Sequence, residues 1–184
     1  MGGSVTLSFG IAHPEMCRAL IIAGAGSGST NRDELLVSWE AAAETMLTEG
    51  MEKFVQGYAV APARIQLRRK DPLSWAKFSA ALLAHSALGS ALTFRGVQIK
   101  RPTVYESEDQ MRQIDIPTLV LTGDEDEPCI EPSIFMKRNI PASGLAVFPK
   151  SGHTINLEEP DLFNRTVLDF LTAVEAGAWP RRGE

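Results

Sequence analysis

Three short apolar runs stand out against the rest of the chain. They cover 19–23, 118–121 and 145–148, and the middle run is too short for a buried helix and rich in β-branched and aliphatic side chains. Consecutive rather than alternating apolar residues are typical of strands covered on both faces, as in a parallel sheet. The runs therefore predict buried parallel strands. Pro117 fits the start of the second strand, because a residue there need not donate a backbone N–H to the neighbouring strand.

Helical periodicity dominates the long segment between the first two strands. Apolar residues recur at three- and four-residue spacing after Asn31 and Asp33, which favour a helix start, and the pattern resumes after a break at Gly50. Asp71-Pro72 predicts another helix start. The basic run at 68–70 is expected in a solvated loop. The expected elements are helices over 35–47, 51–58, 73–88 and 106–112, with a loop over 95–102.

The remaining segments predict helices that flank the strands. A short helix is expected to end near Ala12, before Pro14. Another is expected over 131–138, and a last one begins at Pro160 with an apolar stripe at helical spacing. These patterns predict an α/β fold in which residues 1–30 and 111–184 form the core. Residues 31–110 would then form a helical cap inserted into that core.

Composition narrows the classes of function. The chain has 184 residues, of which 44% are apolar and 22% charged, as in soluble globular proteins. Its net charge of −5 argues against nucleic-acid binding, and no apolar run is long enough to cross a bilayer. Neither a signal peptide nor a disulfide framework is visible, since only Cys17 and Cys129 are present. We therefore expect a cytoplasmic protein without a membrane partner.

Candidate chemistry gathers where two of the strands end. Asp124, Glu125 and Asp126 directly follow the strand that Gly123 ends, and His153 follows the last strand. The carboxyl ends of parallel strands meet at one edge of a sheet, so a carboxylate there can orient the histidine.

Cofactor and metal sites are not expected. The glycine-rich segment 24–29 has G-x-G-x-G spacing rather than the dinucleotide-binding G-x-G-x-x-G. The three histidines are scattered, and H-E-x-x-H is absent from the sequence.

Three segments, in this order, resemble the C-terminal part of the α/β-hydrolase superfamily. HPEMCRALIIAG at 13–24 is similar to the link into the family's sixth strand, IPTLVLTGDED at 116–126 to the strand that presents its acid, and SGHTINLEEP at 151–160 to its histidine loop. The resemblance implies a partial α/β-hydrolase fold: three C-terminal parallel strands with flanking helices and an inserted helical cap. It implies His153 as the general base and Asp126, in G-x-x-D, as its acid, with Asp124 as the alternative acid.

The resemblance also implies that the nucleophile is absent from this chain. The family's nucleophile stands on a sharp strand-to-helix turn, G-x-S-x-G, and Met1-Gly2-Gly3 is similar to the part just after it. Ser4 and Ser27 are set aside because neither is expected on such a turn. The donors of the oxyanion hole would be missing too, so we expect the chain as given to be inactive.

The implied activity is hydrolysis of an ester or related bond in a small molecule, carried out by a nucleophile–His–acid triad in the full-length parent. Two alternatives stay open: a fragment of a dehalogenase or epoxide hydrolase with an Asp nucleophile, and a non-catalytic binding or interaction protein of the same fold. The strand at 19–23 would also have an open edge, which predicts self-association.

Overall fold

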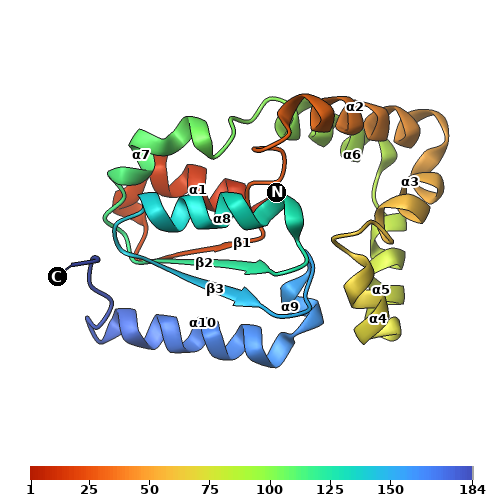
Figure 1. The fold of residues 1–184 in the computed structure, drawn as a ribbon. Helices are drawn as coiled ribbons and strands as arrows, with labels where there is room; N and C mark the ends of the chain where they lie inside the picture. The colour runs from red at the N-terminus through yellow and green to blue at the C-terminus, as the bar shows by residue number, and fades with distance from the viewer. Residues whose placement is uncertain (184) are drawn as a thin grey trace.

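The computed structural model describes residues 1–183. Within them, β1 (Leu20–Ala23), β2 (Thr118–Gly123) and β3 (Ser143–Phe148) form one parallel sheet in the order β1-β2-β3 (Figure 1). Leu20 pairs with Thr118, which pairs with Ser143 on its other side. The predicted buried parallel strands and the α/β fold class are confirmed.

Helices cover both faces of the sheet. Helices α1 (Gly2–Ala12), α7 (Glu108–Arg112) and α8 (Glu127–Asn139) lie over one face, and α10 (Pro160–Glu175) lies under the other (Figure 1). Alternation along β2 explains the two layers, because Val120 packs into the cluster of α1 and α8 while Leu119 and Leu121 pack into that of α10. All six residues of β2 are buried, as expected for the central strand.

A second group of helices stands beside the sheet (Figure 1). This helical group comprises α2 (Arg32–Thr48), α3 (Gly50–Tyr58), α4 (Ile65–Lys70), α5 (Pro72–Leu83) and α6 (Ala87–Thr93). Ala43, Met46, Val55 and Ala91 lie at the centre of its own hydrophobic cluster. The group therefore buries apolar surface largely against itself. Short 3₁₀ turns at Pro14–Met16 and Tyr105–Ser107 complete the connections.

Two predicted elements of this group differ in the structure. The helix expected over 73–88 is broken: α5 ends at Leu83, and Ser86 Oγ accepts from Gly89 N at 3.1 Å to start α6. Residues 95–102 were expected as a loop, but Phe94–Gln98 form a π-helical turn in which Ile99 N donates to Phe94 O at 2.9 Å. The start of α5 is confirmed, because Asp71 Oδ1 accepts from the backbone of Leu73 and Ser74.

The basic run at 68–70 lies in helix α4, not in a solvated loop. Leu67 is buried, and the basic side chains occupy the last turn, where they complement the helix dipole. Lys70 Nζ contacts Ser151 Oγ at 2.9 Å and Glu159 Oε1 at 2.5 Å. Helix α4 thereby joins the helical group to the segment around α9 (Ile155–Glu158), a short helix that the sequence did not predict.

Among the described residues, no helix combines the length and the apolar character that crossing a membrane requires.

Candidate active site

An imidazole and a carboxylate meet where β2 and β3 end. Asp126 precedes α8, and His153 follows β3. His153 Nδ1–H donates to Asp126 Oδ2 at 2.7 Å, with side-chain exposures of 22% and 2%. A carboxylate only accepts hydrogen bonds when ionised, so it holds the proton on Nδ1 and leaves Nε2 as the basic nitrogen.

The loops that carry these two residues touch through their backbones. Glu125 N donates to Ser151 O at 2.9 Å, and a Cβ on Gly123 would lie 2.1 Å from the same oxygen. Asp124 is exposed, and its Oδ1 accepts from Ser151 N at 3.1 Å. Asp124 therefore ties the two loops together, while Asp126 contacts the imidazole. This placement favours Asp126 as the acid, and both assignments stay predictions.

The helical group also holds the histidine loop. Ala63 O accepts from His153 N at 2.6 Å, and Gln66 Nε2 donates to Glu125 Oε2 at 2.8 Å. From the other side, the buried Glu158 carboxylate accepts from Gly152 N at 2.7 Å and from Thr154 N at 3.0 Å. The contacts of Ala63 and Gln66 join residues far apart in sequence, whereas those of Glu158 are local, and sequence reasoning missed both kinds.

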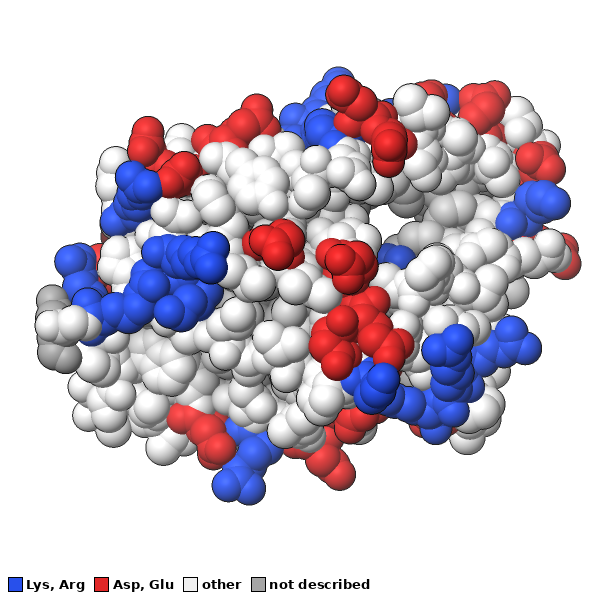
Figure 2. Space-filling model, viewed as in Figure 1, with Lys and Arg blue, Asp and Glu red and all other residues white. Residues whose placement is uncertain are grey.

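A cavity of about 500 Å³ lies between the end of the sheet and the helical group. Figure 2 shows a hollow between these two parts of the molecule. His153 and Asp126 line the cavity from the sheet side, and its apolar wall on the helical side includes Trp39, Phe54 and Phe94. A pocket of this size, with an apolar lining and a few polar groups, suits a small-molecule ligand.

Known proteins resemble this chain in sequence and in fold. The chain is 27% identical over 179 residues to a Bacillus subtilis protein provisionally named 2-succinyl-6-hydroxy-2,4-cyclohexadiene-1-carboxylate synthase, covering 95% of this chain and 64% of that protein. It is 26% identical over 184 residues to a 2-hydroxy-6-oxononadienedioate/2-hydroxy-6-oxononatrienedioate hydrolase of Cupriavidus pinatubonensis, covering 93% and 59%. The structure of MenH from S. aureus matches with a TM-score of 0.85 and 24% identity, over 94% of this chain and 65% of MenH. The chain belongs to the α/β-hydrolase superfamily.

No protein-family model matches this α/β-hydrolase chain. It spans less than two thirds of the two curated relatives, since the matches cover 64% and 59% of their lengths.

The two serines weighed from the sequence lie on different elements of the chain. Ser4 is on α1, and its Oγ accepts from Arg101 at 2.5 Å. Ser27 lies in the segment 24–31 between β1 and α2, and its carbonyl oxygen accepts from Arg101 at 2.7 Å. That segment connects the strand expected at 19–23 to the helix expected after Asn31. It is a long loop rather than the sharp turn that exposes a nucleophile.

Cys129 lies close to the hydrogen-bonded Asp126–His153 pair. Ligand atoms of Asp126, Cys129 and His153 lie within 4.8 Å of one another, which is close enough to ask whether they suit a metal. Burial, followed by the neighbouring Asp126 carboxylate, raises the pKa of the Cys129 thiol far above its ordinary value. The thiol therefore stays protonated, and the Nδ1 and Oδ2 atoms already bind each other. This donor set fits a hydrogen-bonded dyad better than a resident metal ion.

Proposed function

We propose that this chain forms the acid–base part of a hydrolase that cleaves an ester or a related bond in a small molecule. The observation that carries the proposal is the bond from His153 Nδ1 to the buried Asp126 carboxylate at the wall of the cavity. An imidazole held in this way accepts a proton from an attacking hydroxyl at Nε2 and returns it to the leaving group.

The attacking group and the oxyanion donors are proposed to come from polypeptide that precedes Met1 in a full-length parent, so the chain as given is expected to be inactive. The greater length of the curated relatives supports this proposal. Residues 31–110 are proposed to act as a cap over the site. The self-contained cluster of the helical group and its contact with His153 support that role. The reaction needs no cofactor, and a cytoplasmic location stays a prediction.

The experiment compares the 184-residue chain with a longer polypeptide translated from the in-frame codons upstream of Met1. We expect those codons to encode strands that end in G-x-S-x-G, or in G-x-D-x-G for an Asp nucleophile. The longer polypeptide should hydrolyse p-nitrophenyl esters or haloalkanes, respectively, and the short chain should not. Turnover by the short chain that is lost in His153→Ala would overturn the claim that its nucleophile is missing. Upstream codons without such a motif would favour the non-catalytic alternative.

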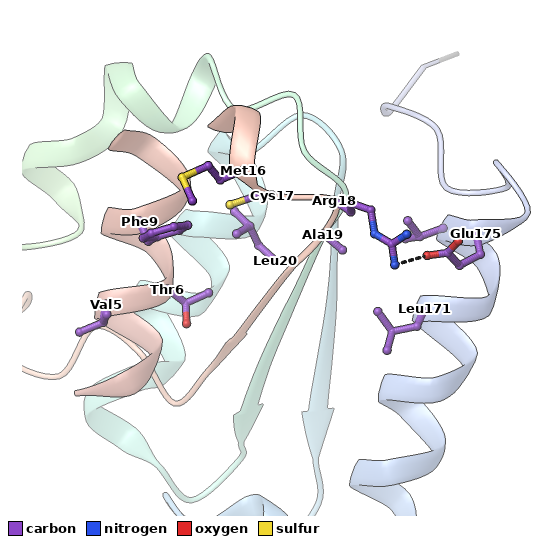
Figure 3. Close-up of a pocket in the computed structure, with 11 residues that line it drawn as sticks. Val5, Thr6, Phe9, Met16, Cys17, Arg18, Ala19, Leu20, Leu171 and Glu175 are labelled. Carbon is purple, nitrogen blue, oxygen red and sulfur yellow. Dashed lines mark ion pairs between the residues drawn. The ribbon is translucent and has the colours of Figure 1, made fainter. Parts of the chain in front are cut away.

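The open edge of β1 supports a further part of the proposal, self-association of the 184-residue chain. Leu20 N donates to the oxygen of residue 117, just before β2, and Gly24 N donates to β2. Alternation along β1 therefore turns the N–H groups of Ile21 and Ala23 to the open side. An apolar groove of about 610 Å³ lies at the start of β1, between α1 and α10, where Ala19 and Leu20 line it. Figure 3 shows Phe9 on one side of it and Leu171 on the other. A second copy that adds its own β1 edge would cover this groove.

We expect wild-type chain to elute as a dimer or larger species in size-exclusion chromatography. The double variant Phe9→Lys/Met16→Lys should shift elution toward the monomer, because both side chains line the groove and are 42% and 68% exposed. Leu73→Lys, at a similarly exposed apolar residue of α5, is the control and should leave the association unchanged. A wild-type chain that stays monomeric at high concentration would contradict the proposal.

A further inference from the structure

Two arginines line the candidate cavity without a carboxylate partner. Arg64 and Arg101 both contribute to its wall, together with His153. Among residues 1–183, neither makes an ion pair, whereas the surface Arg95 binds both Glu40 and Glu44. Removing a guanidinium from water costs free energy unless an opposite charge compensates it. The pair is therefore arranged for a negative charge that the described chain does not supply.

Two hydrogen bonds fix Arg101 in place and leave its other N–H donors unused by the described residues. Its guanidinium donates to Ser4 Oγ at 2.5 Å and to Ser27 O at 2.7 Å, and its Nε is buried without an acceptor. The guanidinium also lies 5.4 Å from the centre of the Trp39 ring. Burial, followed by the nearby Arg32, lowers the pKa of Arg101. An arginine nevertheless stays charged at neutral pH, so an uncompensated positive charge is held at this wall.

Arg64 presents more of its donors to the cavity. Its guanidinium stacks 4.0 Å from the centre of the Tyr58 ring and donates once, to Tyr58 Oη at 2.7 Å. The stacking sets the orientation of the planar guanidinium group. The other N–H donors of Arg64 have no acceptor among the described residues. Arg64 also follows Ala63, the residue whose carbonyl oxygen accepts from His153 N. Arg64 therefore lies in the segment that contacts the backbone of the proposed general base, and both residues line the cavity.

The acids in the same wall do not neutralise these arginines. Asp126 binds His153, Glu125 accepts from Gln66 and lies 3.8 Å from Lys150, and Glu127 is exposed. Their negative charge does disfavour a ligand that carries two charges, such as a phosphate monoester. A carboxylate carries one charge, and its planar shape suits the guanidinium fork.

We infer that the substrate carries a carboxylate, separate from the bond to be cleaved, which Arg64 and Arg101 bind while its apolar body packs against Phe54 and Phe94. The inference names the substrate class of the proposed hydrolase and depends on that function. The described site itself is testable by binding alone, because none of the residues that hold the carboxylate is the missing nucleophile.

The test measures binding of phenylacetate, phenylacetamide and phenyl phosphate to the 184-residue chain by calorimetry. We expect phenylacetate to bind at least about tenfold more tightly than the uncharged amide and than phenyl phosphate, since a charge-assisted bidentate contact contributes more than a neutral one. Arg64→Gln should remove the preference for phenylacetate over the amide. Arg64→Lys, which keeps the charge without the fork, should retain part of it. Arg95→Gln is the matched control outside the cavity and should behave as wild type.

Each outcome separates the inference from the proposed function. A variant that merely perturbs the fold would weaken phenylacetate and phenylacetamide alike, so an unchanged ratio between them in Arg64→Gln overturns the inference. Equal or absent binding of phenylacetate and phenylacetamide by the wild type also overturns the inference, even if a longer polypeptide proves to be an esterase. Tighter binding of phenyl phosphate would assign the arginines to a phosphate group instead. Selective phenylacetate binding without hydrolysis by the longer polypeptide would leave the inference standing and the proposed function overturned.

Discussion

Replacing His153 by alanine in a longer polypeptide that supplies the nucleophile is expected to lower kcat about 10⁴-fold or more. The physical reason is that the imidazole lies at the cavity wall with Nδ1 bound to Asp126, so that Nε2 is the base available to an attacking hydroxyl. KM should change little, because the imidazole acts on the transition state rather than on substrate binding. Steady-state hydrolysis of p-nitrophenyl acetate gives both constants.

The matched pair Asp126→Asn and Asp124→Asn tests the assignment of the acid. Asp126→Asn should approach the loss seen with His153→Ala, since an amide no longer holds the proton on Nδ1. Asp124→Asn should cost far less activity, because Asp124 binds the backbone of Ser151 rather than the imidazole. The reverse ranking of these two variants would make Asp124 the acid, and an active His153→Ala enzyme would exclude the proposed mechanism.

The second large effect is expected at Gly123, where β2 ends against the histidine loop. An added Cβ would lie 2.1 Å from Ser151 O and 2.4 Å from Gly152 O. Both are backbone atoms, so relief requires the whole loop to move away from the end of β2. Gly123→Ala should lower the free energy of unfolding by about 3 kcal/mol, the upper range for overpacking. Urea denaturation monitored by circular dichroism measures this change.

Gly57→Ala provides the control for that measurement. Gly57 lies on α3, and an added Cβ there meets nothing within 4 Å. In a helix this substitution should raise the free energy of unfolding by about 0.5–1 kcal/mol. If Gly123→Ala matched Gly57→Ala in stability, the close approach of the acid and histidine loops would be wrong.

Local patterns in the sequence were enough to predict the sheet and the parts of the site that follow its strands. Consecutive apolar residues report burial on both faces, and the carboxyl ends of parallel strands meet at one edge. Asp126 and His153 could therefore be expected near each other before any coordinates were known. Proline and aspartate at 71–72 likewise marked the start of α5, because a cap is a local interaction.

Tertiary structure alone decided which distant groups complete the site. The backbone of Ala63 holds His153, and Arg101 reaches Ser27 across 74 positions of sequence. No periodicity encodes such contacts, because they depend on how the helical group packs against the sheet. For the same reason the basic run at 68–70 was misjudged as a loop: Leu67 and Lys70 are held in a helix by partners that the local sequence does not contain. The sequence by itself thus determined the strands and placed His153 near the acids at 124–126, whereas the arginines of the cavity became apparent only once packing had brought them together.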